Sequence, residues 1–105
     1  LKVEEFVKYI KYTSGFCYEE KDLWQVADRV ETLIRLFNNR EGLTRQDDTL
    51  PPRILKDAMP EGASKGRHVT KEQLDMLLDN YYSIRGWEKD GSPKKETLEK
   101  LGLKA

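Results

Sequence analysis

The chain has 105 residues, with 19 Lys and Arg against 19 Asp and Glu, so its formal net charge is zero. This length fits one domain or a piece of a larger protein, and no apolar run approaches the roughly 20 residues of a membrane-spanning helix. Zero net charge argues against nucleic-acid binding, which needs a positive excess, and the single cysteine excludes an internal disulfide and fits the reducing cytoplasm.

The first predicted helix starts almost at the first residue. Its apolar residues follow helical spacing on one face, at Val3, Phe6, Val7 and Ile10. Gly15 is a natural left-handed cap at its end. Because the chain begins with Leu1 rather than Met and the helical pattern follows at once, we expect residues 1–105 to be cut from a longer polypeptide.

The second predicted helix is the longest and covers residues 19–40. Its apolar stripe comprises Leu23, Val26, Ala27, Val30, Leu33, Ile34 and Phe37. Trp24 and Leu36 widen this stripe beyond a two-helix seam, so the helix is expected to pack on more than one neighbour. Gly42 marks its end.

The helical pattern disappears between residues 43 and 69, where three of the four prolines lie. A connection of this length is uncommon in a small domain and is either mobile or held against a neighbouring structure. Within it, we expect Asp48 to cap a short turn over residues 49–55. The adjacent carboxylates Asp47 and Asp48 favour capping and an ion pair with Arg45 or Arg53 over general acid–base chemistry.

Two further helices are predicted near the C-terminus. Thr70 and Gln73 have the spacing of a capping box and open the first of them, which Gly86 ends. Ser92 as N-cap and Pro93 at the first helical position open a short last helix, which Gly102 closes. No β-alternation of useful length is present. The predicted fold class is therefore all-α, a multihelical orthogonal array of about four helices with a long irregular connection.

Few residues suggest chemistry of their own. Cys17 lies near the start of the long helix, where a thiol pKa is lowered, but a small buried hydrophobe is the more frequent role. His68 has no second ligand at metal spacing and is expected at the surface. The aromatic residues near residue 82 could form a base-stacking platform, yet helical spacing favours Tyr81 in the core, with Tyr82 and Trp87 bracing the next turn. We predict no catalytic, cofactor-binding or metal residue.

Three ordered stretches resemble the C-terminal domain of the tungsten-containing aldehyde:ferredoxin oxidoreductases. Residues 36–53, LFNNREGLTRQDDTLPPR, follow the family pattern of a long helix that ends in REG and is followed by TR, DD and LP. Residues 59–66 are similar to its PEG…KG loop, and residues 77–93 to its closing YY, RGW, DG and P segment. Together they span nearly the whole chain.

The resemblance implies an all-α domain of an enzyme that oxidises aldehydes to carboxylic acids and passes electrons to ferredoxin. In that family, earlier parts of the chain hold the tungsten (or molybdenum) bis-pterin and one four-iron four-sulfur cluster. Their DxxGL loops and cluster cysteines do not occur here, and Cys17 stands in no cluster-ligand motif. We therefore expect no cofactor in residues 1–105 and no activity from the chain alone.

By this resemblance, the chain packs on the preceding domains of its parent. The structural and interface candidates are Arg40, Arg45, Asp47, Asp48 and Arg53. We expect them to form a buried polar network that ties the irregular connection to the helices or to other domains, since arginine pairs bidentately with carboxylates. Separated from the rest of its polypeptide, the chain is expected to self-associate through apolar patches that become exposed to solvent. The alternative is a free-standing helical interaction module without redox activity.

Overall fold

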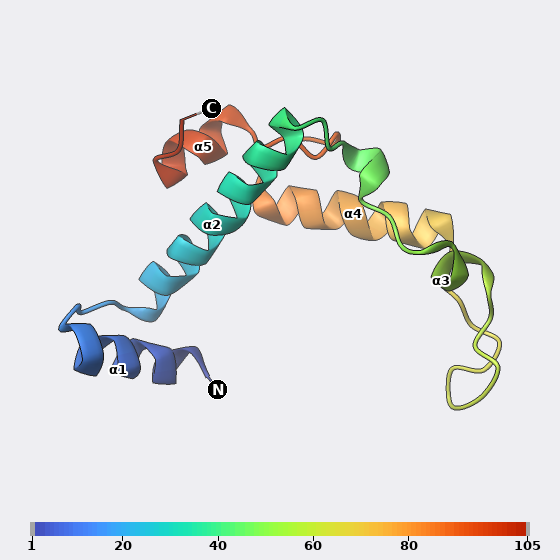
Figure 1. The fold of residues 1–105 in the computed structure, drawn as a ribbon, viewed down its shortest axis with the longest axis horizontal. Helices are drawn as coiled ribbons and strands as arrows, with labels where there is room; N and C mark the ends of the chain where they lie inside the picture. Colours follow the sequence, from blue (N-terminus) through green and yellow to red (C-terminus); the bar gives the residue numbers. More distant parts are fainter. Residues whose placement is uncertain (1, 105) are drawn as a thin grey trace.

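The computed structural model describes residues 2–104 and contains five α-helices and one 3₁₀ helix (Figure 1). In chain order they are α1 (Val3–Ser14), α2 (Glu20–Arg40), η1 (Arg45–Asp47), α3 (Pro52–Lys56), α4 (Lys71–Arg85) and α5 (Lys95–Leu101). Within residues 2–104 the only β pairing is an isolated bridge between Trp87 and Pro93. The predicted all-α class is confirmed, and the additional helix, α3, lies inside the connection that was expected to be irregular.

The helices form an open arrangement around one junction (Figure 1). The C-terminal end of α4 approaches the middle of α2 there, where Arg85 Nη1 lies 2.7 Å from Asp28 Oδ1, and the two helices diverge from it as separate arms. α5 lies against α2, and α3 lies near the N-terminal end of α4. α1 lies at the N-terminal end of α2, away from this junction.

Local sequence signals account for most helix ends. The Thr70 hydroxyl accepts a hydrogen bond from the Gln73 amide at 3.2 Å, and the Gln73 side chain accepts one from the Thr70 amide at 3.0 Å, which confirms the predicted capping box. Gly15 and Gly86 end α1 and α4 in the left-handed conformation, as predicted.

The start of the last helix was predicted two residues too early. α5 begins at Lys95, with Lys94 as its N-cap. Ser92 cannot cap it because its amide and hydroxyl both donate to the Asp90 carboxylate, at 2.9 and 2.5 Å. Pro93 is held in the bridge to Trp87 instead of forming the first helical turn.

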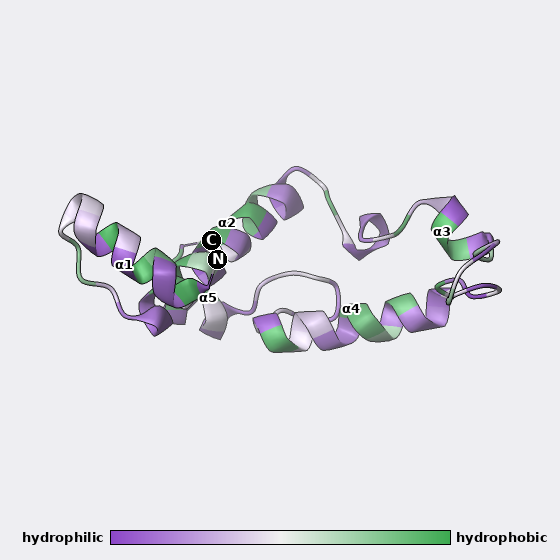
Figure 2. Ribbon diagram, turned by 90° about the horizontal axis from the view of Figure 1, so that it is seen from below, coloured by the Kyte–Doolittle hydropathy of each residue, from purple (hydrophilic) through white to green (hydrophobic). Residues whose placement is uncertain are grey.

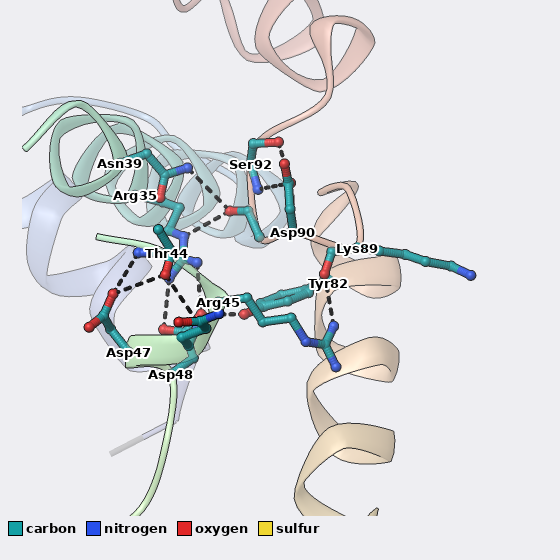
Figure 3. A network of polar contacts seen from close by, with 12 residues as sticks. Arg35, Asn39, Thr44, Arg45, Asp47, Asp48, Tyr82, Lys89, Asp90 and Ser92 are labelled. Atoms are coloured by element: carbon teal, nitrogen blue, oxygen red, sulfur yellow. Dashed lines mark hydrogen bonds and ion pairs between the residues drawn. The ribbon is translucent and has the colours of Figure 1, made fainter. Parts of the chain in front are cut away.

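The buried core is small and lies at the junction. Its apolar members are Tyr82, Trp87, Leu98 and Leu101, and its polar members are Thr32 and Arg35. The prediction that Tyr81 lies in the core was wrong, because Tyr82 is the buried member of the pair. The side chain of Tyr82 is only 2% exposed, whereas that of Tyr81 is 40% exposed. Tyr82 points toward the connection that follows α2 (Figure 3), and its ring also lies 5.7 Å from the Arg35 guanidinium of α2 and 6.0 Å from the Trp87 ring.

The chain is far more open than a globule of its length. Its radius of gyration is 18.1 Å, against about 13 Å for a compact domain of this size. Its accessible surface is 8647 Å², against about 6,100 Å² for a compact monomer of this mass. Hydrophobic segments run along α1, α2, α3 and α4 (Figure 2), and many of their large side chains are exposed. The predicted excess width of the α2 stripe is thus an apolar surface without a cover in residues 2–104.

No helix in the described part of the chain is both long and apolar enough to span a bilayer.

Candidate functional site

Arg35 is the centre of the main polar cluster (Figure 3). It lies on α2 and is only 7% exposed. Its Nε donates to the Gly91 carbonyl oxygen at 2.8 Å, and its Nη1 donates to Asp48 Oδ1 at 2.8 Å. Its Nη2 lies 2.7 Å from Asp48 Oδ2. One guanidinium therefore joins α2 to two segments that lie 13 and 56 residues later in the chain.

The turn that begins η1 places Asp48 for this pairing. The Thr44 amide donates to Asp47 Oδ2 at 2.8 Å, and the Thr44 hydroxyl accepts from the Gln46 amide at 3.3 Å. This reciprocal capping fixes the short helix and leaves Asp48 directly after it, where both carboxylate oxygens meet Arg35. The Tyr82 hydroxyl donates a hydrogen bond to Asp48 Oδ2. Asp48 thus links α2 to α4.

Arg45 makes a second connection beside the first. Its Nη1 donates to the Asp79 carboxylate at 2.5 Å and to the Lys89 carbonyl oxygen at 2.8 Å. Its Nη2 donates to the Asp75 carbonyl oxygen at 3.2 Å. The guanidinium also lies 5.3 Å from the centre of the Tyr82 ring, within the range of a cation–π contact. Arg45 therefore ties η1 to both α4 and the loop after it.

The loop between α4 and α5 completes the cluster. The Trp87 amide donates to the Tyr82 carbonyl oxygen at 2.8 Å, and the Glu88 amide donates to the Ser92 carbonyl oxygen at 2.7 Å. Gly91, at the tip, has a φ of +84°. A Cβ at this position would collide with the Arg35 guanidinium and lie 3.1 Å from the Tyr82 hydroxyl. Glycine is required there by conformation and by space.

The cluster perturbs the titration of its own members. Burial alone would raise the pKa of Asp48, but hydrogen bonds from Arg35 and Tyr82 and the charges of Arg35 and Arg45 bring it below the ordinary value of 3.8. Burial raises the pKa of Tyr82, and its hydrogen bond to the Asp48 carboxylate raises it further, to about 12. At neutral pH the carboxylate is therefore ionised and the phenol is protonated.

The five candidates predicted from sequence are divided by the structure. Arg45 and Asp48 lie in the cluster, and Asp47 supports it by capping η1. Arg40 and Arg53 lie outside it and are exposed. Arg40 is 3.5 Å from the carboxylate of Glu41, the next residue, and Arg53 is 4.0 Å from that of Asp57, one helical turn later.

The expectation that Asp48 caps the turn of α3 was wrong. Pro51 occupies the N-cap position of α3, and the Asp48 carboxylate is engaged by Arg35. Arg35 itself was missed because it lies inside the stretch that reads as apolar stripe. One signal could have found it: it is the only charged residue in the run 33–37, and a buried arginine in such a run requires a carboxylate partner.

Cys17 is exposed, contrary to the expected buried role, because it lies in the extended link between α1 and α2. His68 is exposed, as predicted. Within residues 2–104 there is no group of three or more His, Cys, Asp and Glu side chains that could hold a metal ion. The single cysteine of the chain cannot supply the several thiolates that an iron–sulfur cluster requires.

A hollow of about 450 Å³ opens beside the cluster, between α2 and α4. Its walls include Ile34 on α2 and Leu74, Leu78 and Tyr81 on α4, and Arg35 and Asp48 also line it. Arg35 and Asp48 neutralise each other, the Asp47 carboxylate accepts from the Thr44 amide, and Glu31 adds a further carboxylate from α2. The arrangement can hold these segments together and accept apolar groups beside them.

Comparisons with known proteins agree on one family. The family model for aldehyde ferredoxin oxidoreductase, domains 2 and 3, matches residues 1–103. The tungsten-containing aldehyde ferredoxin oxidoreductase of Pyrococcus furiosus is 38% identical over 104 residues, which are 98% of this chain and 17% of that protein. The enzyme of the same description from Thermococcus kodakarensis is 36% identical with the same coverage.

A solved structure extends the match to three dimensions. The active site complex BamBC of benzoyl coenzyme A reductase, determined with 1,5-dienoyl-CoA, contains a chain that superposes with a TM-score of 0.77 at 34% identity. The match covers 98% of this chain and 14% of that one. The chain therefore spans about one sixth of the length of these curated relatives.

Proposed function

The chain belongs to the aldehyde ferredoxin oxidoreductase family, within its domains 2 and 3, and we propose that it is the C-terminal helical domain of a larger enzyme of this kind. In this proposal residues 1–105 form one all-α domain without a cofactor or activity of its own. Its work is to pack against the preceding domains of the same polypeptide and help to enclose the redox site that they carry.

The proposed reaction of the whole enzyme is the oxidation of an aldehyde to a carboxylic acid, with ferredoxin as the electron acceptor. A bis-pterin tungsten or molybdenum centre and a four-iron four-sulfur cluster would supply the redox chemistry from the other domains. The names of the tungsten-containing relatives support this proposal. A reducing, cytoplasmic location is part of it, supported by a lone cysteine that stays free and exposed.

The observation that carries the proposal is the openness of the chain. Its accessible surface exceeds that of a compact monomer by about 2,500 Å². A standard protein–protein interface buries about 800 Å² on each partner, so the excess is enough for extensive packing against further structure. In the Arg35 cluster, the guanidinium is paired with the Asp48 carboxylate and bonded to the Gly91 carbonyl oxygen. These contacts join segments of the chain, which supports a structural role.

Two versions of the polypeptide test the proposal. The full-length protein encoded with this chain should contain tungsten or molybdenum and iron, and should oxidise aldehydes with ferredoxin as acceptor. A version that ends before residue 1 should lose soluble, active protein, because the surface that this domain covers becomes exposed. Full activity of the truncated protein would contradict the proposal and favour an interaction module without redox activity. Stoichiometric metal in the 105-residue chain alone would contradict the proposal that the chain holds no cofactor.

A further inference from the structure

α2 carries a regular row of exposed apolar side chains, the α2 seam, which consists of Val26, Val30, Leu33 and Phe37. The spacing between them is four, three and four residues, which places them on one line of the helix. Each is between 47% and 55% exposed. Leu23, three residues before Val26, extends the row toward the start of the helix. The seam runs for about 17 Å along the helix.

The rest of the described chain flanks the seam but does not cover it. A groove of about 560 Å³ follows its C-terminal half, with Leu33 and Phe37 on one wall and Pro93 and Leu98 on the other. α2 therefore forms one side of this trough, and α5 with the residues just before it forms the other. The Arg40 guanidinium lies 5.2 Å from the centre of the Phe37 ring and bounds the trough at its end.

We propose that the α2 seam is the docking surface for an apolar helix of the same polypeptide, supplied by the domains outside residues 1–105. The inference rests on the proposed function, since it names what that packing surface is and what it receives. An alternation of three and four residues is the pattern that takes the side chains of a second helix at a small crossing angle. An extended segment or a loop has no such repeat to match.

The residues beside the seam favour a helix of the same polypeptide over a second copy of this chain. In a symmetric helix pair, the positions that flank the seam carry complementary charges that fix the pairing. Here the flanking positions include the apolar residues Ala27, Ile34 and Leu36, and Arg29 is the charged one. A face that is apolar on both sides of its seam is typical of a helix buried among several others. The relatives are about six times as long as this chain and contain the sequence to supply them.

The first test measures the thermal unfolding midpoint and the soluble yield of the full-length polypeptide and of its variants. Val30→Asp and Leu33→Asp should each lower its thermal unfolding midpoint by several degrees and reduce its soluble yield several-fold. Gln25→Asp is the matched control, because it introduces the same side chain on the same helix, away from the seam, and it should leave both quantities close to wild type. Seam variants that behave like Gln25→Asp overturn the proposal.

The second test needs no substitution and holds even if a variant fails to fold. Hydroxyl-radical footprinting of the wild-type full-length polypeptide should show Phe37 protected several-fold relative to the urea-unfolded protein, independently of protein concentration. Phe37 oxidised at the rate of a half-exposed side chain overturns the proposal. Protection that disappears on dilution assigns the seam to a second copy and overturns it as well. If the full-length protein lacks metal and activity but Phe37 is protected, the proposed function fails while the docking surface stands.

Discussion

The side chain of Arg35 and the carbonyl group of Gly91 meet at 2.8 Å although 56 residues separate them. This contact and the pairing of Arg35 with Asp48 join α2, the connection after it and the loop before α5 at a single guanidinium. The absence of a side chain at Gly91 makes the approach possible. The junction of the open arrangement is therefore held by polar contacts as much as by its small apolar core.

Gly91→Ala should be the most disruptive glycine substitution in this loop. The new methyl group would collide with the buried guanidinium, and alanine would have to adopt a φ of +84°, so we expect a loss of more than about 2 kcal/mol in the free energy of unfolding. Urea unfolding followed by tryptophan fluorescence measures it. Gly62→Ala is the matched control: its φ is +83° but the space around it is open, so it should lose only about 1 kcal/mol. Equal losses would show that backbone conformation alone matters.

Asp48→Ala should strongly destabilise the junction. Arg35 is buried, and the Asp48 side chain is only 21% exposed, so removing the carboxylate leaves a buried positive charge with one carbonyl partner. We expect a loss of about 3 kcal/mol, the lower end of the range for breaking a buried ion pair, in chemical or thermal unfolding. Asp57→Ala, which removes an exposed carboxylate 4.0 Å from Arg53, should change stability by less than about 0.5 kcal/mol. An unchanged melting temperature for Asp48→Ala would remove the structural role of the cluster.

Replacing Arg35 and Asp48 together should cost less free energy of unfolding than the sum of the two single replacements. In the double variant Arg35→Met, Asp48→Leu neither charge is left alone, and apolar residues of similar volume often replace a buried pair without loss. A double-mutant cycle with the two single variants should therefore give a coupling energy of about 1–3 kcal/mol. Strictly additive losses would show that the two side chains do not act as a pair.

Stability should fall at both ends of the pH scale. The pKa of Asp48 is below its ordinary value, so the stability that its carboxylate contributes is present above pH 3.8 and is lost as the pH falls through the folded-state pKa. The pKa of Tyr82 is raised from 10.0 to about 12, so its contribution is present below pH 10 and is lost as the pH rises toward 12. Circular dichroism melts across this range measure both limbs, and Tyr82→Phe should remove the alkaline limb. An alkaline limb that survives in Tyr82→Phe would assign the effect to other groups.

Separated from the rest of its polypeptide, the 105-residue chain should self-associate. Its half-exposed apolar side chains on α1, α2 and α4 exceed what monomeric proteins usually leave in contact with water. Size-exclusion chromatography with light scattering should give a mass that increases with concentration. A strict monomer at every concentration would contradict the expectation.

Much of the architecture followed from local patterns. Apolar spacing placed α2, and Thr70 with Gln73 marked the start of α4, because such signals act within a few residues. The same kind of local signal gave the wrong start for α5. A serine before a proline is typical of a helix N-cap, but the Ser92 hydroxyl donates to the carboxylate of Asp90, two residues earlier. Local patterns do not rank competing partners of one side chain.

The cluster was only half visible in the sequence for a different reason. The density of charge after α2 pointed to Arg45 and Asp48, yet their partners lie on α2, on α4 and on the loop before α5, at separations of 13 to 44 residues. Arg35 was hidden among apolar neighbours, and Tyr82 was assigned to the turn and Tyr81 to the core. Long-range pairing depends on how the helices are placed, and in an open arrangement that placement is not fixed by a shared core.

The size of the natural gene product tests the central claim most directly. An antibody raised against residues 1–105 should detect, in a denatured extract of the cells that make this chain, a single polypeptide of about 600 residues, the length of the relatives of which it forms 17%. A single band at the size of the 105-residue chain, with none at the larger size, would contradict the claim that these helices are the packing domain of a larger oxidoreductase.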